Sequence, residues 1–126
     1  MVNKMTFRDL IVWKKAIAMT KIVYQVSRDL PMEERYGLTS QMRRAAVSVA
    51  SNIAEGNARQ ARPDYIHFLM IARGSLAELE TQLIIAGELH MLSETETIME
   101  AIQETRRILQ GLITSLRKEP RSKEAR

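Results

Sequence analysis

Six polar residues have the types and the helical spacing that could carry chemistry. They are Arg44, Ser48, Asn52, Glu55, Ser75 and Glu78. Residues three, four, seven or eleven positions apart share one side of a helix, so Arg44, Ser48 and Glu55 fall on one side of a predicted helix together with Ser51. Asn52 lies near the core edge of the same helix. Ser75 and Glu78 lie at the core margin of the next helix, where they can face the first group.

Two interpretations of this polar set differ in function. The six side chains can form a partly buried hydrogen-bonded network that fixes the register of two helices, with Arg44 compensating a carboxylate. They can instead line a cavity in which Glu55 or Glu78 acts as an acid–base group. No nucleophile or base is paired with either carboxylate, so we favour the structural network.

Basic residues form a second candidate site in the first part of the chain. The net charge is only +4, but residues 1–62 carry 11 Lys and Arg against five Asp and Glu, whereas residues 63–126 carry eight against ten. Lys14, Lys21 and Arg28 recur every seven residues and Lys15 stands beside them. This stripe could follow a phosphate backbone, although a stripe of this kind is more often a solvated face.

The remaining candidate chemistry is weak. The aromatic residues Trp13, Tyr24, Tyr65 and Phe68 fall on predicted core stripes, so we expect no platform for stacking single-stranded bases. Asp64 and His67 have the spacing of a di-iron helix motif, but it occurs once, and His90 lies in a predicted loop.

No cysteine, phosphate-binding glycine loop or catalytic serine motif is present. We therefore predict a protein that is not an enzyme, with no metal and no cofactor. The sequence identifies no small-molecule substrate.

The elements that must position these residues are helices. Apolar residues recur at helical spacing over residues 9–29, 39–57, 63–88 and 93–118, and the linkers are short enough for antiparallel neighbours. Ser93 and Glu96 have the spacing of a capping box at the start of the last helix. We predict an all-α fold, an antiparallel up-down four-helix bundle over residues 1–118, followed by a charged, frayed tail at residues 119–126.

Further apolar residues lie outside the core stripes and suggest subunit association. Ile11, Ala18 and Ile22 form a second strip on the first helix, and the third helix has a second, mostly apolar side with Ile71 and Ile85. The second helix is rich in small residues that allow close helix packing. From these apolar strips we predict a homo-oligomer. We predict a cytoplasmic location because no signal peptide or membrane-spanning stretch is found.

Three blocks of the sequence resemble a known bacterial family. They are residues 7–16 (FRDLIVWKKA), residues 34–45 (ERYGLTSQMRRA) with Ser48 and residues 52–56 (NIAEG), and residues 72–83 (ARGSLAELETQL) preceded by Tyr65 and Phe68. In this order they resemble the 23S rRNA-intervening sequence proteins. The resemblance implies a four-helix bundle that assembles as a ring-shaped homopentamer, and it assigns no catalytic residues.

A more distant relative of that fold is the basic, pentameric accessory protein of diversity-generating retroelements, which associates with nucleic acid. We therefore expect a non-enzymatic homopentamer of unestablished role that binds RNA or DNA through a basic face. The alternative is a structural or protein-interaction scaffold without nucleic-acid binding. Fold kinship alone does not decide between them.

Overall fold

Four long helices joined by short connections make up the computed structural model, which describes residues 5–118. The elements are a 3₁₀ turn η1 (Phe7–Asp9), α1 (Ile11–Ser27), a 3₁₀ turn η2 (Met32–Glu34), α2 (Leu38–Ala58), α3 (Arg62–Glu88) and α4 (Glu96–Lys118). The predicted frayed tail, residues 119–126, lies outside the described residues.

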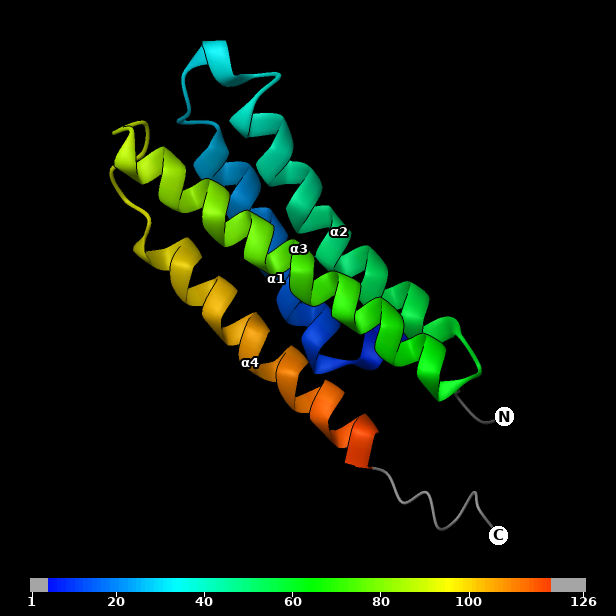
Figure 1. The fold of residues 1–126 in the computed structure, drawn as a ribbon. Helices are drawn as coiled ribbons and strands as arrows, with labels where there is room; N and C mark the ends of the chain where they lie inside the picture. Colours follow the sequence, from blue (N-terminus) through cyan, green and yellow to red (C-terminus); the bar gives the residue numbers. More distant parts are fainter. Residues whose placement is uncertain (1–4, 119–126) are drawn as a thin grey trace, which may run out of the picture.

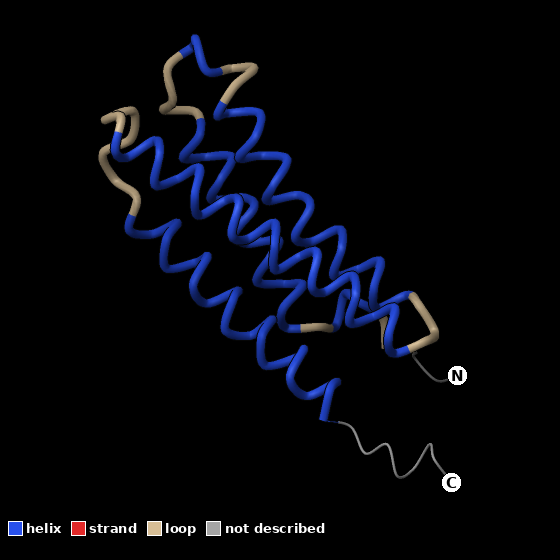
Figure 2. The backbone as a smooth tube through the Cα atoms, in the orientation of Figure 1, coloured by secondary structure: helices blue, strands red, loops and turns tan. Residues whose placement is uncertain are grey.

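The helices run up and down along one common direction (Figure 1). The α1–α2 and α3–α4 connections lie at one end of the bundle, and the α2–α3 connection lies at the other. Each of α1 and α3 packs against both α2 and α4, so α1 and α3 lie diagonally opposite each other in the bundle. No strand occurs among residues 5–118 (Figure 2), and the predicted all-α four-helix bundle is confirmed.

One continuous apolar core runs along the bundle axis. On α4 the buried stripe is Ile98, Ile102, Leu109 and Ile113, which have the helical spacing on which the prediction for residues 93–118 rests. The facing layers come from the other helices, and their largest fully buried members are Met19, Val23, Met42, Ile53, Leu69, Leu76, Leu79 and Leu83. Burial of each such side chain contributes about 1.5–3 kcal/mol, so this core holds the four helices together.

The start of α4 differs from the prediction. The helix begins at Glu96, three residues after Ser93, so the proposed capping box does not form its first turn. The reason lies at the end of α3, where His90 has a left-handed backbone with φ of 58° and the Met91 amide donates to the Ala86 carbonyl at 2.8 Å. This closure ends α3, and the chain then uses residues 91–95 to cross to α4.

The start of α2 also has a cap that the sequence pattern did not indicate. The sequence pattern predicts a helix from residue 39, and the helix begins at Leu38. The Glu34 side chain accepts a hydrogen bond from the Leu38 amide at 3.0 Å. A carboxylate at this position satisfies a free backbone N–H and interacts favourably with the positive end of the helix dipole.

Helices α2 and α3 pack tightly against each other near the α2–α3 connection. Gly56 is buried there, and a Cβ atom at this position would lie 2.8 Å from the Phe68 Cβ and 3.1 Å from the Tyr65 carbonyl oxygen. Buried alanines, among them Ala45 on α2 and Ala72 on α3, extend the interface. Small side chains on α2 thus let the two backbones approach closely.

We predict opposite effects of alanine at two helical glycines. Gly56→Ala should lower the free energy of unfolding by about 1–3 kcal/mol, because α3 must move to admit the methyl group. Gly111→Ala should raise it by about 1 kcal/mol, because nothing lies within 4 Å of the added Cβ and alanine favours the helix. Urea unfolding followed by circular dichroism measures both, and a stabilised Gly56→Ala variant would contradict the close approach.

Candidate nucleic-acid interface

The outer face of α1 carries three exposed basic side chains, Lys14, Lys21 and Arg28. They face away from the core because Val12, Ala16, Met19 and Val23 occupy the opposite side of the same helix. At a spacing of seven residues the charges follow one another about 10 Å apart along the helix. None of the three has an ion-pair partner within residues 5–118.

Lys15 does not belong to this face. Its Nζ lies 3.2 Å from the Glu104 carboxylate on α4, and its side chain is 42% exposed. The two side chains bridge the α1–α4 seam, an exposed pair of the kind that contributes about 0–1 kcal/mol. The structure therefore brings together three of the four predicted nucleic-acid-binding residues and turns the fourth towards α4.

Three of the six residues in the predicted polar network are joined by hydrogen bonds. The Ser48 and Ser75 hydroxyls are 2.8 Å apart across the α2–α3 interface, and Ser75 is buried. The Asn52 side-chain amide donates to the Ser48 carbonyl oxygen at 2.8 Å and to the Ser48 Oγ at 3.0 Å. These bonds satisfy the polar groups internally and link α2 to α3.

The other three residues of that set lie outside the network. Glu55 forms an exposed pair with Arg59 one helical turn away, at 2.9 Å. Arg44 and Glu78 are exposed and line a shallow hollow of about 390 Å³ between α2 and α3, which Glu55 does not reach. Arg44 and Glu55 lie further around α2 than Ser48 and Asn52, so their side chains point to solvent.

A groove that the sequence analysis missed lies between α1, the turn after η2 and the first half of α2. Its volume is about 610 Å³, and its walls are Tyr24, Arg35, Tyr36, Thr39, Ser40, Arg43, Arg44, Val47 and Ser48. Every ionisable side chain in that wall is an arginine or a tyrosine. The paired arginines at positions 43 and 44 were the available signal, but the sequence pattern does not show that α1 supplies a tyrosine beside them.

Tyr24 was predicted to lie in the core, and this prediction is wrong. Its side chain is 40% exposed, and the Arg43 guanidinium carbon lies 4.6 Å from the centre of its ring. Val23 and Ser27 point inward instead, so the helix rotation leaves Tyr24 at the edge of α1 beside α2. Tyr36, which was not considered as a core residue, is 88% exposed.

Arg43 is held firmly at the α1–α2 seam. Its Nε donates to the Ser27 Oγ at 2.9 Å, and its Nη2 donates to the Tyr24 carbonyl oxygen at 3.4 Å. The guanidinium thus bridges the last turn of α1 and stacks on the Tyr24 ring, a cation–π arrangement. A smaller, largely apolar hollow of about 250 Å³ continues along the same seam and shares Val47 with the groove.

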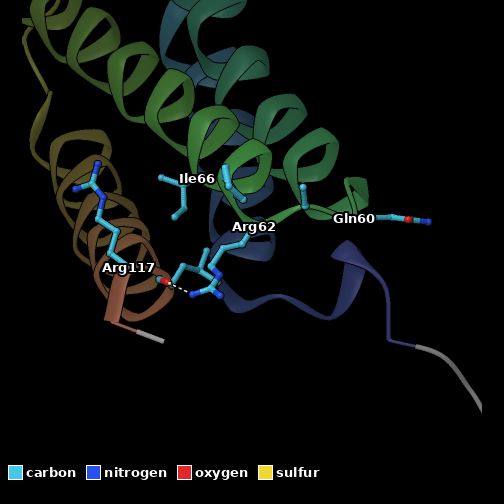
Figure 3. A pocket seen from close by; sticks show the side chains of 7 residues that line it. Gln60, Arg62, Ile66 and Arg117 are labelled. Atoms are coloured by element: carbon cyan, nitrogen blue, oxygen red, sulfur yellow. Dashed lines mark hydrogen bonds between the residues drawn. The ribbon is translucent and has the colours of Figure 1, made fainter. Parts of the chain in front are cut away.

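A third hollow, of about 710 Å³, lies at the end of the bundle where α3 begins and α4 ends (Figure 3). Gln60, Arg62, Ile66 and Arg117 are among its lining residues. The Arg62 Nη1 donates to the Leu116 carbonyl oxygen at 3.4 Å, a bond drawn in Figure 3. This contact satisfies a carbonyl in the last turn of α4 and joins α3 to α4.

The described residues contain no group of three or more His, Asp or Glu side chains placed to hold a metal ion. His67 is exposed, and its ring packs edge-on against Phe68 with centroids 5.6 Å apart. Within residues 5–118 no helix is long and apolar enough to cross a membrane.

Comparison with known proteins decides the family. Residues 8–111 match the family model of the 23S rRNA-intervening sequence proteins. The chain belongs to this family. The match covers most of the bundle and confirms the resemblance drawn from the sequence blocks.

A solved structure shares the family fold. It comes from a protein of the S23 ribosomal protein family of Bacteroides thetaiotaomicron, which is described as having unknown function. The two chains are 24% identical with a TM-score of 0.75, and the match covers 82% of this chain and 98% of the other. At that identity the likeness shows the fold alone. Comparison with curated proteins gives no significant match.

For this member of the 23S rRNA-intervening sequence family, we predict measurable energetic coupling between Ser48 and Ser75. A double-mutant cycle with Ser48→Ala and Ser75→Ala should give a coupling free energy of about 0.5–1.5 kcal/mol, because each hydroxyl is the other's partner in a part-buried site. Glu55→Ala paired with Ser75→Ala is the control, since Glu55 bonds only to Arg59 in the described chain, and its coupling should lie near zero. Equal coupling in both cycles would contradict the network.

Proposed function

We propose that this member of the 23S rRNA-intervening sequence family is a non-enzymatic, homo-oligomeric protein that binds RNA or DNA through the outer face of α1. The observation that carries the proposal is the row of Lys14, Lys21 and Arg28, exposed and without carboxylate partners among the described residues. Unpaired cations in a row gain free energy by replacing the counterions of a phosphate backbone. Binding to cellular RNA or DNA would place the protein in the cytoplasm.

Self-association is supported by apolar side chains that the single bundle leaves in water. Ile11 is 65% exposed and Leu89 is 58% exposed, and Ile71, Ile84 and Ile85 are also exposed on α3. Covering such side chains with a second copy would remove apolar surface from water. The family resemblance implies a ring-shaped pentamer, which would repeat the α1 face five times around one assembly.

The hydrogen bonding and exposure of the candidate polar residues support the proposal that the protein is not an enzyme. Ser48, Asn52 and Ser75 use their hydrogen bonds on one another, and Glu55 and Glu78 are exposed. Glu78 lines the hollow between α2 and α3, but the Ser48 hydroxyl in that hollow bonds to Ser75 and Asn52, whereas a catalytic hydroxyl would bond to a base.

A second candidate function is a protein-interaction or structural scaffold without nucleic-acid binding. The observation that favours it is the apolar hollow along α1 and α2, lined by Trp13, Ile17, Val47 and Ala50 among others. Such a hollow could receive an apolar segment of a partner protein. Nucleic-acid titration separates the two candidates, because a scaffold would leave labelled RNA and DNA free at low salt.

We expect wild-type protein to bind fluorescently labelled RNA or DNA in anisotropy titrations at 50 mM salt. The affinity should fall steeply as salt is added. The double variant Lys14→Glu with Lys21→Glu should weaken binding at least tenfold and reduce the slope of log K against log salt by about one per lost phosphate contact.

Arg107→Glu serves as the matched control, because Arg107 is an exposed cation on α4, away from the α1 face. It should change affinity less than threefold. No binding by the wild type at low salt, or equal losses in the α1 and α4 variants, would contradict the proposal.

We expect light scattering to give a mass several times the 14.4 kDa of one chain. Ile85→Glu combined with Leu89→Glu should lower that mass, because both substitutions place a charge on an exposed apolar stretch of α3. Thr81→Glu, an exposed α3 position, is the control and should leave the mass unchanged. A wild-type mass of one chain would contradict self-association.

A further inference from the structure

We infer that the groove formed by Tyr24, Tyr36, Arg35, Arg43 and Arg44 binds unpaired nucleotides of a single-stranded nucleic acid, with bases stacked on the tyrosines and phosphates held by the arginines. This inference rests on the proposed nucleic-acid binding and names its substrate class. It also reverses the expectation from the sequence, which excluded a stacking platform because Tyr24 was placed in the core.

The groove combines the two kinds of group that single strands require. Every base has an aromatic face, so exposed aromatic side chains bind unpaired bases with little regard to sequence, while a positive wall follows the backbone. Tyr36 is almost fully exposed and Tyr24 is partly exposed on the opposite, α1 side of the groove.

The arginines differ in how they are held. Arg43 is fixed by Ser27 and the Tyr24 carbonyl, so its guanidinium already occupies one position before a ligand arrives. Arg44 lines the same groove and has no ion pair or hydrogen bond within residues 5–118. The Arg35 guanidinium carbon lies 6.0 Å from the centre of the Tyr36 ring. A planar guanidinium can bind phosphate through two donors or stack on a base, which a lysine cannot do as well.

The groove adjoins the basic face of α1. Tyr24 follows Lys21 by three residues and precedes Arg28 by four, and on a helix these spacings bring side chains within about 5–6 Å at Cβ. A strand whose bases enter the groove can therefore continue along Lys21 and Lys14 with its phosphates. The α1 face would supply charge to any nucleic acid, and the groove would add a preference for unpaired bases.

A duplex does not fit this chemistry. Its bases are stacked on one another, so their faces are unavailable to Tyr24 and Tyr36, and only the phosphates can reach the arginines. Guanidinium groups of Arg43 and Arg35 already lie near the Tyr24 and Tyr36 rings. An acidic peptide would satisfy these arginines but would place no aromatic group on the exposed parts of the two rings. The arrangement of rings and guanidinium groups therefore favours single strands over both.

The test measures anisotropy of a labelled 12-nucleotide U strand, the corresponding dT strand and a 12-base-pair duplex, with wild type and variants. Wild type should bind the single strands more tightly than the duplex. Tyr36→Ala and Tyr24→Ala should each weaken single-strand binding by about 5- to 150-fold, change duplex binding less than twofold and leave the salt slope unchanged.

Tyr24→Phe and Tyr36→Phe are the matched controls, because they keep the aromatic ring and should retain most of the affinity. Tyr36 is so exposed that Tyr36→Ala is expected to fold normally, which circular dichroism checks. Lys14→Glu with Lys21→Glu should instead weaken single strands and duplex alike and reduce the salt slope.

The outcomes distinguish a failure of the proposed nucleic-acid binding from a failure of the groove inference. If wild type binds neither strand nor duplex, the proposed function fails. If it binds both, and the α1 charge reversals weaken binding while Tyr36→Ala and Tyr24→Ala do not, the function stands and the groove inference is wrong. The groove inference is also wrong if a ten-residue poly-glutamate peptide displaces the strand from wild type and the tyrosine substitutions weaken binding of that peptide. It is wrong as well if the tyrosine variants lower the oligomer mass without changing strand binding.

Discussion

The close contact between α2 and α3 is the constraint on which the rest of the bundle depends. Gly56 lies against Tyr65 and Phe68 with no room for a methyl group, and Ser48 and Ser75 meet at 2.8 Å further along the same interface. Small residues permit this approach, and the hydroxyl pair fixes how far one helix slides along the other. With α2 and α3 set in this way, the buried stripes of α1 and α4 have one geometry in which both cover the core.

Other small residues of α2 shape its surface beside α1. Ala50, Ser51 and Ala54 fill little of the space between α2 and α1, which leaves the apolar hollow along that seam. Near the start of α2 the side chains beside α1 are larger, and Arg43 and Arg44 line the groove together with Tyr24. Small side chains on α2 thus leave a hollow beside α1, and the arginines and tyrosine near the start of α2 line the groove that adjoins it.

The sequence predicts the helices well because core burial repeats at the helical period, as in Ile98, Ile102, Leu109 and Ile113. It predicts contacts poorly where they depend on how far each helix rotates about its axis. Lys15 and Lys14 are adjacent in the chain, yet one pairs with Glu104 and the other faces solvent. Tyr24 fits a core stripe within the tolerance of the pattern, but the final rotation places it beside Arg43. Ser48, Asn52 and Ser75 are joined by hydrogen bonds at the α2–α3 interface, where their spacing along the two helices alone brings them close.

The diagonal placement of α1 and α3 makes self-association and polyanion binding compatible in one molecule. The two helices do not contact each other, so their outer faces point away from one another across the bundle. Exposed Ile71 and Ile85 lie on α3 and Leu89 directly follows it, whereas Lys14 and Lys21 lie on α1 and Arg28 directly follows it. A closed assembly that covers these residues, and Ile11 in the first turn of α1, would need to leave the Lys14, Lys21 and Arg28 row of each subunit in solvent. Since the salt-dependent free energy grows with each phosphate contacted, repetition would turn three positive charges per subunit into an extended basic surface that binds polyanions.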